Sequence, residues 1–170
     1  MPLQKRWEEI LYSMAKKNKI KFLALDIDGV LTDGGMYYTE AGDEFKKFNT
    51  KDGMGIKLVK QAGIEVCFIS SGKNSTIIKN RAKLLGVKYV YVGLDEKLDV
   101  LNKWCKELKI SLAQVAYIGD DVNDLQIISA VGLSACPADA VDKIKAIAKI
   151  KLKRNGGDAC VREFIDKYLL

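Results

Sequence analysis

Histidine is absent from this sequence, and so are long apolar runs. The first absence excludes Ser-His-Asp and Cys-His catalysis, histidine phosphatases and metal sites built on imidazole. Any catalysis must therefore use carboxylates, lysine, hydroxyls, thiols or a metal held by oxygen. The second absence excludes a membrane span, which needs about 20 apolar residues. Because residues 1–18 mix Lys, Arg and Glu and lack the apolar region of a secretory signal, we expect a cytoplasmic protein with no membrane partner.

Cysteine pairs with metal-binding spacing are missing too. The four cysteines lie far apart, at Cys67, Cys105, Cys136 and Cys160, and no C-x-x-C pair occurs. No arginine stands six places after any of them, which excludes the loop of cysteine-dependent phosphatases. We expect reduced thiols that pack as small core residues, and no zinc site.

The charge is unbalanced toward the positive side, with a formal net charge of +6. Most lysines alternate with Glu and Asp, and the one basic stretch, residues 143–154, contains no aromatic residue. We therefore predict a solvated helix face there and no nucleic-acid partner. A weaker alternative is a positive field that attracts an anionic substrate.

Strand and helix patterns alternate along the chain, whose 170 residues suit one domain, residues 1–170. The expected strands cover residues 20–25, 65–69, 89–92, 115–118 and 133–135. The expected helices cover residues 1–18, 54–61, 74–85, 96–108, 123–130, 140–148 and 159–169. This alternation predicts an α/β fold: a Rossmann-like, doubly wound parallel sheet with helices on both faces. Residues 34–48 predict a small β-hairpin, and no other insertion is long enough for a second domain.

Acidic residues follow two of the predicted strands. Asp26 and Asp28 come directly after the first strand, and Asp120, Asp121 and Asp124 follow the fourth. Both strand ends can lie at the same edge of a parallel sheet, where clustered carboxylates repel unless a cation separates them. Mg²⁺ is the natural cation for oxygen ligands. Helix capping is an alternative for Asp121 and Asp124 but does not account for the acids of the first strand.

These segments resemble the haloacid dehalogenase superfamily of phosphohydrolases. The resemblance rests on Asp-x-Asp-Gly-Val-Leu-Thr-Asp at residues 26–33 and Gly-Asp-Asp-x-Asn-Asp at residues 119–124. Ser71 and Gly72 match the second motif, and Lys97 matches the third. Residues 48–56, 81–87 and 156–163 narrow the resemblance to the 3-deoxy-D-manno-octulosonate 8-phosphate (KDO 8-phosphate) phosphatase branch, and the similarity extends over residues 21–170. That branch implies a hairpin in place of a cap domain, and a homotetramer in which neighbouring subunits cover the site.

The resemblance also implies residue roles. Asp26 would be the nucleophile, and Asp28 the acid and base. Mg²⁺ would be held by Asp26, Asp120 and the backbone carbonyl of Asp28. Ser71 and Lys97 would bind the phosphoryl oxygens. Asp121 and Asp124 would not bind the metal themselves but would orient the metal ligands or waters.

A further group of residues would bind the phosphate and the sugar. This group comprises Asn49, Thr50, Lys51, Asp52, Gly53, Gly72, Lys73, Arg81 and Arg162. Three of them have structural alternatives: Lys51 as a surface lysine, Arg81 paired with an acid on its own helix, and Asp52 as a helix N-cap. Gly156 and Gly157 predict a turn.

Lys73 departs from the branch, which usually has arginine after the glycine of the second motif. Lysine keeps the charge but loses planar, bidentate recognition. KDO 8-phosphate is the expected substrate, with a nine-carbon 2-keto sugar acid 9-phosphate as the alternative. A phospho-receiver signalling domain is a rival of another class, although the middle strand ends in serines and provides no acidic phospho-acceptor. A silent scaffold and a sugar-phosphate mutase are further rivals.

Overall fold

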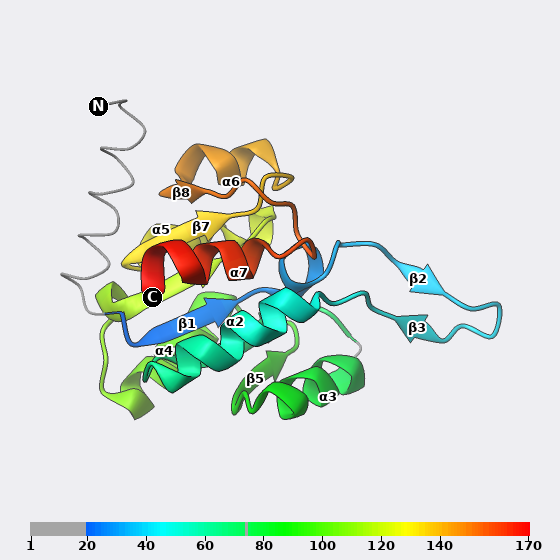
Figure 1. Cartoon of the computed structure of the whole chain (residues 1–170), viewed down its shortest axis with the longest axis horizontal. Helices are drawn as coiled ribbons and strands as arrows, with labels where there is room; N and C mark the ends of the chain where they lie inside the picture. Colours follow the sequence, from blue (N-terminus) through cyan, green and yellow to red (C-terminus); the bar gives the residue numbers. More distant parts are fainter. Residues whose placement is uncertain (1–19, 74) are drawn as a thin grey trace.

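A six-stranded parallel sheet forms the centre of the computed structural model, which describes residues 20–73 and 75–170 (Figure 1). The helix expected in residues 1–18 lies outside the described residues. In spatial order the strands are β5 (Tyr89–Val92), β4 (Glu65–Ser70), β1 (Phe22–Leu25), β6 (Val115–Ile118), β7 (Leu133–Cys136) and β8 (Ile150–Lys151). Strands β1, β4, β5 and β6 lie within two residues of their expected bounds.

Helices cover both faces of the sheet, as the sequence predicts. Side chains of β1 alternate between the faces, because successive residues of a strand point to opposite sides. Leu23 and Leu25 pack toward one face, and Phe22 and Ala24 toward the other. The first face carries α2 (Thr50–Gln61), α3 (Ser75–Leu85) and α7 (Cys160–Phe164), which a π-helical turn extends through Ile165–Leu169. The second face carries α4 (Lys97–Leu108), α5 (Leu125–Ala130) and α6 (Asp142–Ile147).

Two boundaries differ from the prediction. Helix α2 begins at Thr50, four residues earlier than expected, because the Asn49 side chain accepts a hydrogen bond from the Lys51 N–H and caps the helix. Asp52 is thus a residue of the first turn and not the N-cap. The solvated helix predicted for residues 143–154 is wrong beyond α6, since the chain continues into β8 and buries Ile150 and Leu152.

The hairpin is present where it was predicted. Strands β2 (Tyr37–Tyr38) and β3 (Glu44–Phe45) pair antiparallel and project from the body of the molecule (Figure 1). An antiparallel bridge between Thr32 and Phe48 closes its base. The rings of Tyr37 and Phe45 stack at 5.3 Å between centroids, so the base is ordered by packing as well as by backbone pairing.

Strand order places a ligand crevice at the end of β1. From β1 the chain winds outward through β4 and β5, then crosses back to β6 on the other side of β1. Ligands of doubly wound sheets bind outside the carboxyl ends of the strands at such a switch point. Leu25 of β1 and Ile118 of β6 are register partners, so the acidic segments that follow them begin side by side. Within residues 20–73 and 75–170, the helices are too short or too polar to cross a membrane.

Candidate active site

Three carboxylates meet at the carboxyl ends of β1 and β6. Asp26, Asp120 and Asp124 each offer an oxygen, and these oxygens lie within 4.8 Å of one another. Asp26 is buried, and its N–H donates to the carbonyl of Ile118, which ties the end of β1 to β6. The sequence placed these acids at one edge of the sheet, and the structure brings them together there.

Lys97, the first residue of α4, lies between two of these acids. Its ammonium is 2.9 Å from Asp26 Oδ2 and 2.7 Å from Asp124 Oδ1, and its side chain is only 3% exposed. Burial by itself would lower the pKa of Lys97, but the Asp26 and Asp124 carboxylates outweigh it and raise that pKa. Lys97 therefore remains a cation beside Asp26, where it can neutralise negative charge.

Asp124 is fully occupied by protein donors. Its Oδ1 accepts from Lys97 and, at 2.6 Å, from the Tyr117 hydroxyl. Its Oδ2 accepts from the backbone N–H of Asp120 at 2.9 Å and of Asp121 at 3.3 Å. Asp124 thus fixes the loop after β6. The Asp121 side chain caps the short turn Val122–Asp124 by accepting a hydrogen bond from the Val122 N–H. This is the helix-capping role that the sequence offered as an alternative for Asp121.

The remaining acids suit a divalent metal. Asp120 Oδ1 is buried and has no hydrogen-bond partner among the described residues. Burial, with the Asp124 carboxylate adding to it, raises the pKa of Asp120 to about 7. Burial and the same neighbour also raise the pKa of Asp26, against the effect of Lys97. An oxygen-binding cation would satisfy the orphaned atom and keep both carboxylates ionised, so the residues fit such an ion.

A cavity of about 350 Å³ opens over this cluster. Ten residues line it: Asp26, Asp28, Gly29, Gly34, Ser70, Ser71, Gly72, Asp120, Asp121 and Asn123. Asp28 is half-buried and receives a 2.6 Å contact from the Lys46 ammonium. Gly29 has φ of +83°, and a β-carbon there would overlap the Asp120 carboxylate. Glycine is therefore required for Asp120 to lie against the first motif.

The second motif contributes its backbone and two hydroxyls to the cavity. Ser70 Oγ accepts from the Gly72 N–H at 3.0 Å, which shapes the loop after β4. Ser71 is exposed, and its hydroxyl accepts from the Asn123 side chain at 3.3 Å. Lys73 is exposed and is not among the residues that line this cavity.

The start of α2 has a structural role that the sequence did not assign. Asp52 is fully buried, and its Oδ1 accepts from the Arg162 N–H at 2.7 Å at the start of α7. Arg81 donates to the Asn49 carbonyl at 3.2 Å and lies 5.3 Å from the Phe48 ring centroid, so it does not pair with an acid on its own helix. Thr50 is exposed and Gly53 is buried in the same turn; a β-carbon on Gly53 would meet the Arg81 guanidinium.

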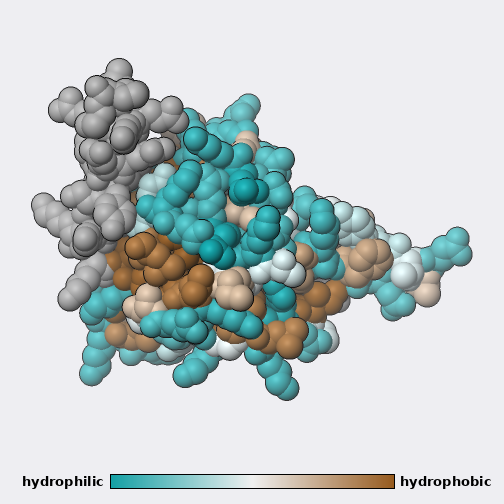
Figure 2. All heavy atoms as spheres, viewed as in Figure 1, coloured by the Kyte–Doolittle hydropathy of each residue, from teal (hydrophilic) through white to brown (hydrophobic). Residues whose placement is uncertain are grey.

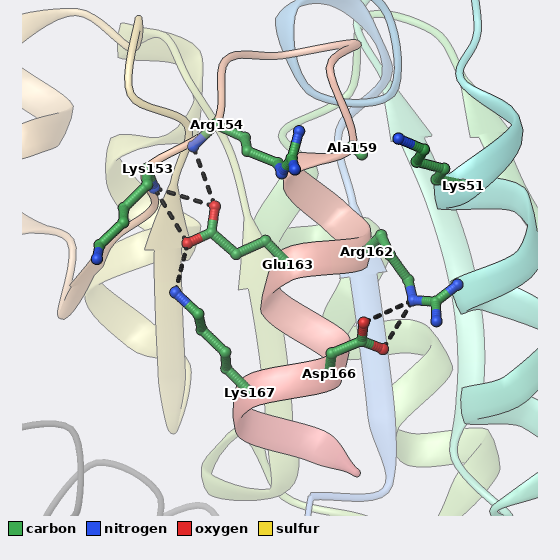
Figure 3. A pocket seen from close by; sticks show the side chains of 8 residues that line it. All are labelled: Lys51, Lys153, Arg154, Ala159, Arg162, Glu163, Asp166 and Lys167. Atoms are coloured by element: carbon green, nitrogen blue, oxygen red, sulfur yellow. Dashed lines mark hydrogen bonds and ion pairs between the residues drawn. The ribbon is translucent and has the colours of Figure 1, made fainter.

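Lys51 and Arg162 lie apart from the carboxylate cluster. They line a separate pocket of about 730 Å³ on the outer side of α7 (Figure 3). Arg162 Nε donates to Asp166 at 2.7 Å along its own helix (Figure 3). The sequence predicted that Lys51 lines the pocket for phosphate and sugar and that Arg162 contacts a substrate carboxylate; within the single chain both side chains line this basic pocket, and their substrate contacts stay predictions.

Sequence patterns missed Lys46, Tyr117 and Asn123. Tyr117 stands in an apolar strand, and nothing local marks its hydroxyl as the partner of Asp124. Asn123 was part of the fourth motif but was given no role. For Lys46, the alternation of side chains along a strand puts it on the same face of the hairpin as Glu44. That alternation was the only feature of the sequence that could have indicated its position.

Comparison with known proteins identifies the family. Residues 94–165 match a family of haloacid dehalogenase-like hydrolases. A KDO 8-phosphate phosphatase of Escherichia coli strain K12 is 38% identical over 157 residues, which span 92% of this chain and 83% of that protein. The chain belongs to the haloacid dehalogenase-like hydrolases, in the KDO 8-phosphate phosphatase branch. It is a phosphatase of this superfamily.

Solved structures of the KDO 8-phosphate phosphatase branch share the fold. The Moraxella catarrhalis enzyme, in complex with magnesium, phosphate and KDO, superposes with a TM-score of 0.89 at 34% identity, covering 95% of this chain and 91% of that one. The cobalt-bound Haemophilus influenzae enzyme has a TM-score of 0.85 at 38% identity, covering 91% and 90% of the two chains. These matches extend across the sheet and both helical layers, so the acidic cluster lies in the framework common to the branch.

Proposed function

We propose that this chain is a Mg²⁺-dependent phosphomonoesterase that hydrolyses KDO 8-phosphate to KDO and phosphate, a step in lipopolysaccharide precursor synthesis in the cytoplasm. The observation that carries the proposal is the contact of Asp26 with Lys97 beside Asp120, at the bottom of a cavity that Asp28 also lines. The named substrate is supported by the Escherichia coli relative and by the Moraxella catarrhalis complex.

In the proposed reaction, a carboxylate oxygen of Asp26 forms a bond to phosphorus while the bond from phosphorus to the sugar oxygen breaks. Asp28 gives its proton to the leaving sugar oxygen. It then takes a proton from the water that attacks the aspartyl-phosphate, which releases phosphate and restores the Asp26 carboxylate. Lys97 holds Asp26 in place and offsets the charge of the phosphoryl group. Asp26, Asp120 and the Asp28 carbonyl would hold Mg²⁺, which supplies shielding between the anionic nucleophile and the anionic phosphate.

For the sugar acid, the proposed contacts are the second-motif residues Gly72 and Lys73, together with Asn49 and Thr50 at the start of α2. Lys51 and Arg162 line the other pocket, so a substrate contact by them would occur at a site completed by a second copy of the chain.

A homotetramer is part of the proposal. Met36, Tyr38 and Phe45 on the projecting hairpin are 64%, 56% and 53% exposed, and the hairpin carries apolar surface (Figure 2). Apolar side chains on a two-stranded ribbon favour a partner surface. The count of four copies follows from the resemblance to the branch, so sedimentation velocity should find a tetramer, and a monomer at assay concentration would contradict this arrangement.

A nine-carbon 2-keto sugar acid 9-phosphate is the second candidate substrate, because Lys73 replaces the arginine usual in the branch. A side-by-side measurement of kcat/KM for the two substrates discriminates between them. Asp26→Asn and excess chelator should each abolish turnover, whereas Asp99→Asn, an exposed aspartate on α4, should leave it unchanged. Turnover that survives Asp26→Asn would overturn the mechanism.

A further inference from the structure

A lysine of the hairpin contacts Asp28, one of the residues that line the active-site cavity. Lys46 follows β3, and its ammonium lies 2.6 Å from Asp28 Oδ1 and 2.8 Å from Glu44 Oε1. Its side chain is 5% exposed, whereas the next residue, Lys47, is 66% exposed. The Lys46 side chain is thus shielded and its ammonium forms charge-assisted contacts with two carboxylates, the shielded Glu44 and the Asp28 side chain, which is 40% exposed.

The two oxygens of Asp28 have different surroundings. Oδ1 is taken by Lys46. Oδ2 lies on the side of the second motif, because a β-carbon placed on Gly72 would come 3.7 Å from it. Asp28 and Gly72 both line the cavity above Asp26. With Oδ1 held by the lysine, Oδ2 is the oxygen left to face a phosphate ester in that cavity.

The backbone around Lys46 is held independently of the cavity. Phe48, two residues later, bridges to Thr32 of the first-motif loop. Phe45, one residue earlier, stacks on Tyr37, whose hydroxyl donates to Asp33 Oδ2 at 2.7 Å. The base of the hairpin therefore fixes Lys46 relative to the loop that carries Asp28. The backbone that carries the Lys46 side chain is therefore fixed next to Asp28.

We propose that Lys46 is a positioning residue that holds Asp28 with Oδ2 toward the substrate. The hairpin thereby contributes to catalysis within its own subunit, in addition to any contact with another copy. This inference rests on the proposed function, in which Asp28 transfers the proton to the leaving oxygen. It predicts a selective defect: loss of Lys46 impairs substrates whose leaving group needs that proton and spares those whose leaving group does not.

The test compares kcat/KM for two phosphate esters. KDO 8-phosphate has an alkoxide leaving group that requires protonation, whereas p-nitrophenyl phosphate releases a stable phenolate. General acid catalysis contributes about 10²- to 10⁴-fold, so Lys46→Met should lower kcat/KM for KDO 8-phosphate by about a hundredfold. The loss on p-nitrophenyl phosphate should be about fivefold or less. Asp28→Asn should show the same selectivity, and the control Lys57→Met, at an exposed lysine of α2, should leave both values unchanged.

Lys46→Arg retains the charge and moves the donors, so its loss should be smaller, about tenfold, with the same selectivity. If Lys46→Met does not fold, Lys46→Arg serves as the test variant in its place. An equal loss on both esters, or no loss on either, would overturn the positioning role alone. Activity in Asp26→Asn would instead overturn the proposed function, and with it this role.

Discussion

Asp52 provides a test of how α2 and α7 are joined. Its side chain is fully buried, and its Oδ2 has no partner in the part of the chain that the structure describes. Burial raises the pKa of Asp52 to about 6, against the lowering effect of the N–H groups of Arg162 and Val161. In the unfolded chain the pKa of the same carboxyl is about 4. At a pH between about 4 and about 6, the Asp52 carboxyl therefore binds a proton in the folded chain but not in the unfolded chain.

The raised pKa of Asp52 makes the free energy of unfolding depend on pH. A raised pKa in the folded state gives stability that is fully present below about pH 4 and is lost as the pH rises through about 6. The gap between about 6 and about 4 corresponds to about 3 kcal/mol of unfolding free energy. About half of this falls between pH 5 and pH 8. The amide introduced by Asp52→Asn cannot ionise and keeps an oxygen that accepts the Arg162 N–H, so the substitution removes this pH dependence.

Urea unfolding of the wild type and Asp52→Asn, measured in chelator from pH 5 to pH 8, checks the prediction. The unfolding free energy of the variant minus that of the wild type should rise by about 1.5 kcal/mol across this range. Taking the difference cancels the titration of groups common to both proteins. Asp99→Asn is the matched control, since Asp99 is also the third residue of its helix but is exposed, and its difference should stay flat. A flat difference for Asp52→Asn would refute the reasoning.

Three further predictions concern the catalytic loops. Because burial and the Asp124 carboxylate raise the pKa of Asp120 to about 7, Mg²⁺ must displace a proton at acid pH; its affinity should fall about tenfold from pH 8 to pH 6 by titration calorimetry. Gly156→Ala places a methyl group on the Gly29 carbonyl oxygen, so urea unfolding should show a loss of about 1–3 kcal/mol. Tyr117→Phe removes the buried donor to Asp124, so it should cost about 1–3 kcal/mol by the same assay and lower kcat/KM.

Much of the architecture could be read from local patterns. Short apolar strands alternating with helices predicted the parallel sheet, and turn residues around Gly42 predicted the hairpin. The last strand, β8, was missed because it has only two residues and lies in a basic stretch. An apolar pattern that short does not indicate a strand. The start of α2 was misplaced because the Asn49 cap precedes a turn that contains Gly53, a weak helix former.

The spacing of residues along the chain predicted that Asp26 and Asp120 follow two strands of one parallel sheet, which brings them close together, whereas Lys97 was identified only through its resemblance to the third motif. Residues at strand ends are placed by the sheet, so their proximity follows from topology. The contact of Lys46 with Asp28, and the position of Arg162 in a different pocket, became visible only in the folded chain. Those contacts depend on how a hairpin bends and how two helices pack side by side. Such packing is set by side-chain burial across distant segments, which no local spacing encodes.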